Sequence, residues 1–195
     1  MKKVIVTLKS VSPYEQSKHY NVPKLEKESP ADYEERTWRN RLHSDKMLPD
    51  GSVDPEGEVF IPPMAFKNCL SEAAKYLGQQ IPGKGKATYT KHFEAGVMVL
   101  DPVPLGIKVK DVPPLRLFVS ADGKRGSGKR VDKVFPVIAS WSANVTFYVL
   151  DETITQNVFQ KHIEEAGKFI GIGAFRPRNN GFYGRFEILD VQWAA

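Results

Sequence analysis

Alternation of apolar and polar residues predicts the strands of this chain. In "KVIVTLK", Val4, Val6 and Leu8 alternate with their neighbours, which is the pattern of a strand with one face in a core. "WSANVTFYVLD" repeats this pattern, and "GVMVLDPVPLGI" and "YGRFEILDVQW" have the composition of strands. We therefore expect four strands, near residues 3–9, 95–101, 142–150 and 184–192.

A helical repeat of apolar residues predicts two longer helices, near residues 63–78 and 155–169. The first ends at Gly78, because glycine readily takes the left-handed conformation that terminates helices. The inner side of the second helix is expected to carry Val158, Phe159, His162, Ile163, Ala166, Phe169 and Ile170. Between the two helices, "IPGKGKATYTKHFEAG" has the composition of a loop.

A third, short helix is predicted in the polar segment "SPADYEERTWRNRLH", with Ser29 as its N-cap and Pro30 at its first position. Acidic residues in and before it form a charge run that is typical of a solvated helix face, namely Glu26, Glu28, Asp32, Glu34 and Glu35. Trp38 is expected to pack against the domain, with stacking on a base as the alternative.

These elements, taken in chain order, give β-α-β-β-α-β once the polar insertions are removed. This order is typical of an α+β protein with a ferredoxin-like (RRM-like) fold, in which two helices cover one face of a four-stranded antiparallel sheet. We expect a single domain over residues 1–195, with large loop insertions at about 10–58 and 103–140. The fold is shared by many unrelated functions and does not by itself identify one.

Composition narrows the class of protein. The formal net charge of +5 over 195 residues is moderately basic, which favours a polyanionic partner weakly. A single cysteine, Cys69, excludes an internal disulfide and a cysteine-based zinc cluster, so a reducing, cytoplasmic compartment is expected. The N-terminal segment has the pattern of a strand and not of a signal peptide, and no apolar run is long enough to span a bilayer.

The richest candidate site is "GIGAFRPRNNGFYGRFEI", between the last predicted helix and the last predicted strand. Glycines allow a backbone to approach a ligand, arginines pair with phosphates, and aromatic rings stack on bases. These features predict a nucleic-acid-binding loop made by Gly171, Gly173, Phe175, Arg176, Arg178, Tyr183 and Arg185. The alternative is an ordinary helix-to-strand loop with Phe175 and Phe182 in the core.

Two further basic segments are candidates for the same role. The glycine-rich "ADGKRGSGKRVDK" is expected to be a mobile tip between two strand-like arms, and it carries Lys124, Arg125, Lys129 and Arg130. The alternative for it is a solvated hairpin tip, and it does not fit the spacing of a phosphate-binding P-loop. Lys84 and Lys86 lie in a segment that mixes charged and aromatic residues, a composition that suits a groove along a single nucleic-acid strand. The alternative is a surface loop.

Two stretches resemble CRISPR-associated RAMP proteins. "VFIPPMAFKNCLSEAAKYL" is similar to the segment in which a RAMP strand enters the first helix as "(Y/F)IPGSSLKGALR", and "IGIGAFRPRNNGFYGRFEI" is similar to the C-terminal loop of the type "GGxRxRGFGRVEV". The resemblance covers about forty of the residues and points to the backbone-subunit branch, whose members line up along guide RNA. It places Lys67 near the RNA backbone. The loop after the first strand lacks the aspartate of subunits that cut target RNA, so the resemblance does not extend to cleavage.

Catalytic patterns are weak in this sequence. The four histidines are scattered, and none is expected to pair with a nearby carboxylate at the spacing of a metal site. His162 is expected to be a core or boundary residue with its hydrogen bonds satisfied, and Asp151 a turn residue. We therefore expect a non-enzyme without metal or cofactor.

The favoured function is sequence-independent binding of single-stranded RNA, as a homo-oligomer along its ligand or as a subunit of a ribonucleoprotein. One alternative is a mobile-element protein that mimics or inhibits a CRISPR backbone subunit. Another is a phage protein that binds or anneals single-stranded DNA.

Overall fold

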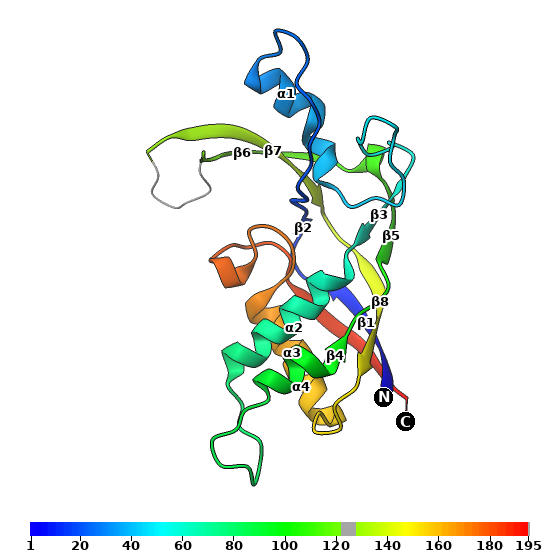
Figure 1. The fold of residues 1–195 in the computed structure, drawn as a ribbon, viewed down its shortest axis with the longest axis vertical. Helices are drawn as coiled ribbons and strands as arrows, with labels where there is room; N and C mark the ends of the chain where they lie inside the picture. Colours follow the sequence, from blue (N-terminus) through cyan, green and yellow to red (C-terminus); the bar gives the residue numbers. More distant parts are fainter. Residues whose placement is uncertain (122–127, 195) are drawn as a thin grey trace. The chain divides into compact units, whose positions relative to one another are not determined.

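The computed structural model describes residues 1–121 and 128–194 of the chain. The chain divides into two compact units that are each built from separate stretches of sequence. Unit 1 comprises Met1–Tyr14, Ile61–Leu105 and Ala139–Ala195, and unit 2 comprises Glu15–Phe60 and Gly106–Ile138. Figure 1 shows the elements of both units.

Unit 1 is built on a four-stranded sheet, and its order is β4-β8-β1-β9. The strands are β1 (Lys2–Ser10), β4 (Val97–Met98), β8 (Ser142–Val149) and β9 (Phe186–Trp193). Each adjacent pair is antiparallel, and Val6 of β1 lies opposite Val145 of β8 and Val191 of β9. The predicted four-stranded antiparallel sheet is therefore present, with its apolar positions in register.

Three helices cover one face of this sheet (Figure 1). They are α2 (Pro63–Leu77), α3 (Thr90–Gly96) and α4 (Gln156–Glu165). The helix α2 has proline at its first position and ends at Gly78, which has a φ of 53°. Its buried residues include Phe66, Cys69 and Leu70, so the predicted apolar face of this helix packs in the core.

The helix α3 corrects the last part of the loop predicted over residues 81–96, since it covers Thr90–Gly96. Phe93 of this helix is fully buried and stacks on His162, with ring centroids 4.2 Å apart. Tertiary packing of Phe93 thus compensates for a composition that is typical of a loop. The helix also shortens the predicted strand near residues 95–101, because Gly96 belongs to α3 and the pairing in β4 covers only Val97 and Met98.

The second predicted helix departs from α-helical geometry after residue 165. Residues Ala166–Ile170 form a π-helical turn, η3, in which the N–H of Gly171 donates to the carbonyl of Ala166 at 2.9 Å. The wider turn rotates the following side chains away from the α-helical face. Phe169, which was expected on the inner side, is 46% exposed, whereas Ile170 is fully buried. His162 is fully buried, as predicted, and its Nδ1 donates to the carbonyl of Val158 at 2.7 Å. Its Nε2 has no hydrogen-bond partner among the described residues, which corrects the prediction that its hydrogen bonds are satisfied.

Unit 2 contains most of the insertions. Its elements are α1 (Pro30–Thr37), the 3₁₀ turns η1 (Trp38–Arg41) and η2 (Val109–Asp111), and the strands β6 (Pro114–Ser120) and β7 (Arg130–Ile138). A three-stranded sheet has the order β2-β7-β6, where β2 is Tyr14–Glu15. A two-stranded sheet pairs β3 (Glu58–Ile61) with β5 (Val103–Lys108). The predicted strand-like arms of the glycine tip are β6 and β7, and residues 122–127 of that tip lie outside the described residues.

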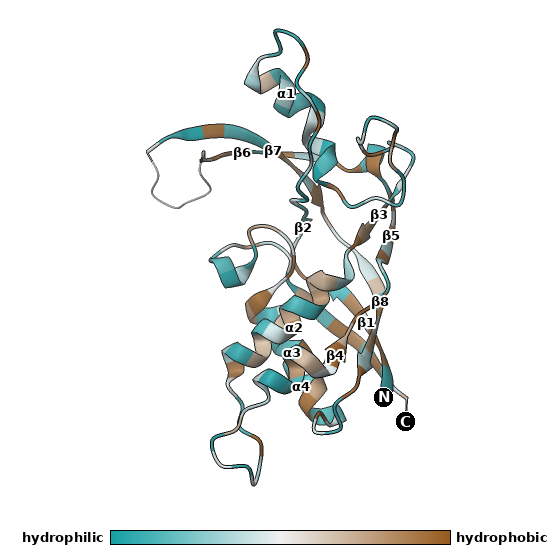
Figure 2. Ribbon diagram, in the orientation of Figure 1, coloured by the Kyte–Doolittle hydropathy of each residue, from teal (hydrophilic) through white to brown (hydrophobic). Residues whose placement is uncertain are grey.

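The short helix α1 is capped as predicted, since Ser29 Oγ accepts from the N–H of Asp32 at 3.1 Å. Its charge run is not wholly solvated, which corrects the prediction for Glu34. Glu34 is only 5% exposed, and its carboxylate accepts hydrogen bonds from Arg41, Lys133 and the N–H of Val134. Trp38 is 2% exposed and packs within the protein, as expected. Figure 2 shows that the rest of α1 is largely hydrophilic.

A second buried carboxylate in unit 2 has no such partners. Glu15 is fully buried, and neither of its carboxylate oxygens has a hydrogen-bond partner among the described residues. Burial raises the pKa of Glu15 from 4.5 to about 7. The folded protein therefore holds this proton more tightly than the unfolded chain does.

We expect the free energy of unfolding to fall as the pH rises from about 4.5 through about 7, by roughly 3 kcal/mol in total, because the folded state must release the Glu15 proton. Glu15→Gln removes that loss and makes the protein more stable than the parent at pH 8.5. Denaturant unfolding at pH 5 and pH 8.5 measures the effect, with exposed Glu26→Gln as the control. Equal pH dependence of the parent and Glu15→Gln would contradict it.

Candidate nucleic-acid interface

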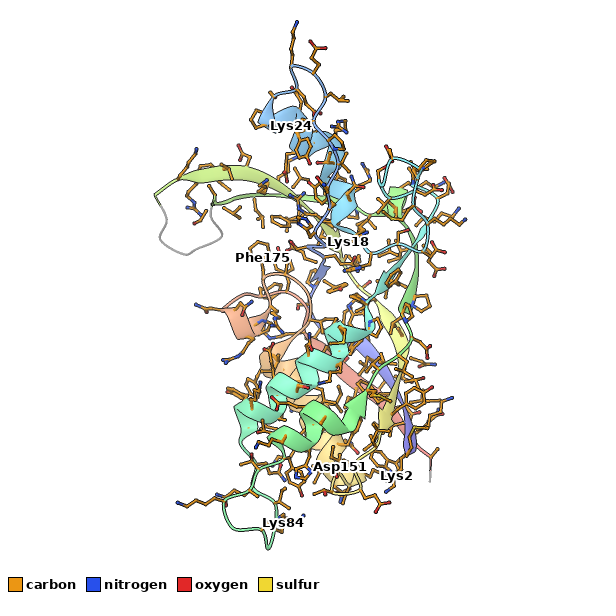
Figure 3. All side chains as sticks on the ribbon, in the orientation of Figure 1. Lys2, Lys18, Lys24, Lys84, Asp151 and Phe175 are labelled. Atoms are coloured by element: carbon orange, nitrogen blue, oxygen red, sulfur yellow. The ribbon has the colours of Figure 1, made fainter. Side chains whose placement is uncertain are left out.

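The glycine-rich loop between η3 and β9 folds back on its own backbone. The N–H of Ile172 donates to the carbonyl of Gly184 at 3.0 Å, and the N–H of Tyr183 donates to the carbonyl of Phe175 at 3.1 Å. The N–H of Gly184 donates at 2.7 Å to the carbonyl of Pro13, which follows β1. The loop is thus a closed structure held to the end of the first strand, and Figure 3 labels Phe175 on it.

Two glycines of the loop are needed for contacts within the loop's own backbone. A Cβ at Gly184, which has a φ of 77°, would collide with the carbonyl of Ile172, and a Cβ at Gly181 would collide with the carbonyl of Phe175. These two glycines allow the loop to approach its own backbone. Gly171 is buried and close to Pro177 in the same way, whereas Gly173 is exposed.

The three arginines of the loop have different environments. Arg176 is 21% exposed at its side chain and its Nη2 donates to Glu72 Oε1 of α2 at 2.8 Å. This ion pair gives the Arg176 guanidinium a partner within the protein. Arg178 is 55% exposed, and its Nε lies 3.9 Å from Glu72 Oε2. Arg185 donates from Nε to the carbonyl of Lys168 and from Nη1 to the carbonyl of Phe182.

Two of these arginines line a surface pocket that was not predicted from sequence. Its cavity volume is about 270 Å³, and its lining consists of Tyr76, Lys168, Phe169, Pro177, Arg178 and Arg185. We call it the aromatic–basic pocket. It brings together the C-terminal end of α2, the π turn and the glycine-rich loop.

Two exposed rings form one side of the aromatic–basic pocket. Tyr76 and Phe169 are 54% and 46% exposed, their ring centroids are 5.5 Å apart, and their planes are inclined by 31°. Lys168, next to Phe169, has its Nζ 3.3 Å from Glu165 Oε1, in an exposed pair of low strength. Exposed rings next to three cations suit a ligand that is both flat and anionic.

Sequence reasoning missed Tyr76, Lys168 and Phe169 for identifiable reasons. Tyr76 lies outside the apolar face of α2. An aromatic residue on the polar side of a helix is the one sign in the sequence that it belongs to a binding surface. Phe169 fitted the α-helical repeat, and only the π turn turns it outward. Lys168 is a common residue on a helix surface and carries no signal of its own.

The other predicted binding residues of unit 1 lie outside this lining. The Nζ of Lys67 donates to Ser71 Oγ at 3.0 Å and to the carbonyl of Glu94 at 2.6 Å, so its ammonium group has internal partners. Lys84 and Lys86 are exposed on the loop between α2 and α3, and Figure 3 shows Lys84 at its end. Phe175 and Tyr183 are half-buried, with ring centroids 6.5 Å apart.

The remaining predicted residues belong to the β6–β7 hairpin of unit 2. Lys129 is exposed. Arg130 donates to the carbonyl of Phe118 at 2.8 Å, and its guanidinium lies 5.2 Å from the centre of the Phe118 ring. Lys124 and Arg125, together with most of the expected mobile tip, lie outside the described residues.

A histidine–carboxylate pair also escaped prediction. The Nδ1 of His92 lies 2.6 Å from Asp151 Oδ2, and each side chain is a little over a quarter exposed. Burial raises the pKa of Asp151, but hydrogen bonds from His92 and the N–H of Thr153 outweigh it and leave the pKa below its usual value. The pair corrects the expectation that Asp151 is only a turn residue. Among the described residues, no group of three or more His, Cys, Asp or Glu side chains is placed to hold a metal ion.

No protein-family model and no curated protein matches this sequence, whereas solved structures resemble its fold. A chain in the cryo-EM structure of the Type III-B Cmr-beta bound to cognate target RNA aligns with a TM-score of 0.54 and 11% identity, over 99% of this protein and 60% of that chain. A Cas6 product complex and a CRISPR RNA-guided surveillance complex align at 12% and 10% identity over 95% and 97% of this protein. They cover 50% and 68% of those chains, with TM-scores of 0.36 and 0.39.

The first of these alignments shows a shared fold with a chain of a CRISPR Cmr complex. The protein spans 60% of the length of that chain. Within the described part of the chain, no helix has the length and apolar character needed to cross a membrane.

We expect Gly184→Ala to lower the free energy of unfolding by roughly 2–4 kcal/mol, because the added Cβ meets the carbonyl of Ile172 as well as an unfavourable φ. Gly83→Ala is the matched control, since Gly83 has a φ of 75° and nothing within 4 Å of the new Cβ. Its expected cost is about 1–2 kcal/mol, the strain of the left-handed conformation alone. Thermal and denaturant unfolding compare the two variants, and equal losses would show that the loop does not need its close backbone contact.

Proposed function

We propose that this protein binds single-stranded RNA through the aromatic–basic pocket, without catalysing a reaction on it. The observation that carries the proposal is the grouping of two exposed rings and three cations in one pocket. A single strand offers unpaired bases to the rings and phosphates to the cations. A duplex hides its base faces and would meet only the cations.

Each wall of the pocket has a defined part in this proposal. Arg178 presents a guanidinium group, which suits the forked geometry of phosphate oxygens. Arg185, whose Nε and Nη1 donate to backbone carbonyls, adds a positioned positive charge, and Lys168 adds a mobile one. Tyr76 and Phe169 present ring faces or edges on which a base stacks, worth roughly 1–3 kcal/mol per base. Arg176 acts as a positioning residue, because its ion pair with Glu72 ties the loop to α2.

The fold supports the same proposal. In unit 1 the strand order β4-β8-β1-β9, with helices after the first and third of these strands along the chain, corresponds to a ferredoxin-like arrangement. We infer that unit 1 is a RAMP-like core of one domain and that unit 2 consists of its insertions. The fold likeness to a Cmr chain, from a structure described as bound to target RNA, favours RNA over DNA and a subunit of a ribonucleoprotein over a solitary protein.

The direct test is a polarisation titration with single-stranded RNA, single-stranded DNA and duplex of equal length. We expect the tightest binding to single-stranded RNA and the weakest to duplex. Each strand is recovered afterwards on a denaturing gel, where intact RNA is expected. Cleavage that disappears in His92→Ala would overturn the non-catalytic part of the proposal and leave the binding part in place.

Removing the exposed cations is expected to weaken binding for all sequences alike. Each neutralised phosphate contributes a slope of about −0.7 to the dependence of log affinity on log salt for single strands. Lys168→Ala with Arg178→Ala should therefore flatten this slope by roughly one to two units. The melting temperature is expected to stay unchanged, because both side chains are more than half exposed. The control is Lys9→Ala with Lys161→Ala, two exposed lysines outside the pocket, and an equal effect of both pairs would contradict a localised site.

Removing the rings is expected to weaken binding in a different way. Tyr76→Ala with Phe169→Ala should lower the affinity for single strands by about tenfold or more and leave the salt slope unchanged, because stacking releases no counterions. Tyr76→Phe with Phe169→Tyr keeps both rings and is expected to bind like the parent. If the alanine pair binds as well as the aromatic pair, the rings take no part in recognition.

A further inference from the structure

A second cavity adjoins the aromatic–basic pocket and shares Lys168 and Arg185 with it. Its volume is about 320 Å³, at the lower end of the range for small-ligand sites. Part of its lining is apolar, from Val11, Phe186 and Ile188. Glu164 of α4 and Glu187 of β9 line it as well, so it places two carboxylates and two cations around an apolar wall.

We propose that this second cavity takes one nucleobase of the bound strand and selects guanine. The inference deepens the proposed function and rests on it, since the shared Lys168 and Arg185 put the cavity beside the proposed phosphate and stacking positions. A base that unstacks from the strand bound in the aromatic–basic pocket can enter this neighbouring cavity. Its ring then covers Val11, which is 58% exposed, and Ile188, and this removes apolar surface from water.

The charged residues decide which base fits. A carboxylate only accepts hydrogen bonds, and Glu164 is held in place by Gln160, whose Nε2 donates to Glu164 Oε1 at 3.2 Å. Guanine carries two adjacent donors, N1–H and the N2 amino group, which together match one carboxylate. Its neighbouring O6 is an acceptor that suits the Lys168 ammonium, four positions further along the chain.

The other bases match this arrangement less well. Adenine and cytosine place a ring-nitrogen acceptor beside their single amino group, so a carboxylate meets repulsion at the second position. Uracil offers one N–H between two carbonyl oxygens. A site built from fixed hydrogen-bonding groups discriminates strongly against partners that leave those groups unpaired.

The experiment uses short uridine strands of RNA with one central position varied among guanine, inosine, adenine, cytosine and uracil. We expect the guanine strand to bind about tenfold more tightly than the uracil strand, the scale of one bidentate base contact. Inosine lacks the N2 amino group and is expected to fall between the two. Equal affinity for all five strands would overturn the proposal.

Two variants test whether the preference for guanine arises in this cavity. Glu164→Gln, which adds a donor where guanine also has donors, should reduce the guanine preference to less than twofold and leave the uridine strand unaffected. Val11→Trp fills the cavity from an exposed position, since Val11 is 58% exposed, and should have the same effect. Exposed Glu152→Gln is the control. A guanine preference that survives both cavity variants would place it elsewhere and overturn the proposal.

A free guanine mononucleotide carries the same ring, so it is tested separately. We expect guanosine monophosphate to displace the guanine strand only at much higher concentration, because it lacks the neighbouring phosphates and stacked bases. Mononucleotide binding without any guanine preference among strands would overturn the inference for RNA. If the ring and cation variants of the aromatic–basic pocket bind RNA normally, the proposed function itself fails. If they lose binding while all bases bind equally, only this inference fails.

Discussion

The return of the glycine-rich loop onto its own backbone is the constraint on which the candidate interface depends. Gly184 joins two backbone segments, because its N–H donates to Pro13 and its carbonyl accepts from Ile172. Only a residue without a Cβ fits between them. The contact leads the chain into β9 and at the same time brings Arg178 and Arg185 next to the rings of α2 and η3.

The second requirement is the distribution of charge around this loop. Glu72 pairs with Arg176 at 2.8 Å and lies 3.9 Å from Arg178, so one carboxylate fixes the half-buried guanidinium and leaves the exposed one available. An ion pair of this partly exposed kind adds little stability in itself. Its value is geometric, since it holds the loop against α2 and keeps Tyr76 beside Arg178.

Unit 2 shows how burial changes the meaning of a charge. Glu34 is buried with hydrogen bonds from Arg41, Lys133 and the N–H of Val134, which compensate for its lost hydration. These contacts tie α1 and η1 to β7 at the base of the β6–β7 hairpin. Glu15 is buried without such partners among the described residues, and it meets the cost of burial by a raised pKa instead.

The sequence by itself determined the frame of unit 1 and the location of its glycine-rich loop. Period-two alternation identified β1 and β8, strand composition identified β9, and apolar repeats with Pro63 and Gly78 identified α2, because local periodicity and capping are properties of short segments. The residues Arg178 and Arg185 were also visible as loop cations. These features survive in the fold because each depends on neighbours within a few residues.

Only the tertiary structure decided which residues share a pocket and what their charges do. A π turn exposes Phe169, packing on His162 makes a helix of the segment around Phe93, and Asp151 meets His92 from 59 positions away. The ion pair between Glu72 and Arg176 likewise joins residues that are far apart in the sequence. Contacts between residues that are distant in sequence have no periodic signature, and burial reverses the usual behaviour of a charged side chain, as Glu34 and Glu15 show. The sequence determined where the elements run, and three-dimensional packing decided which side chains they bring together.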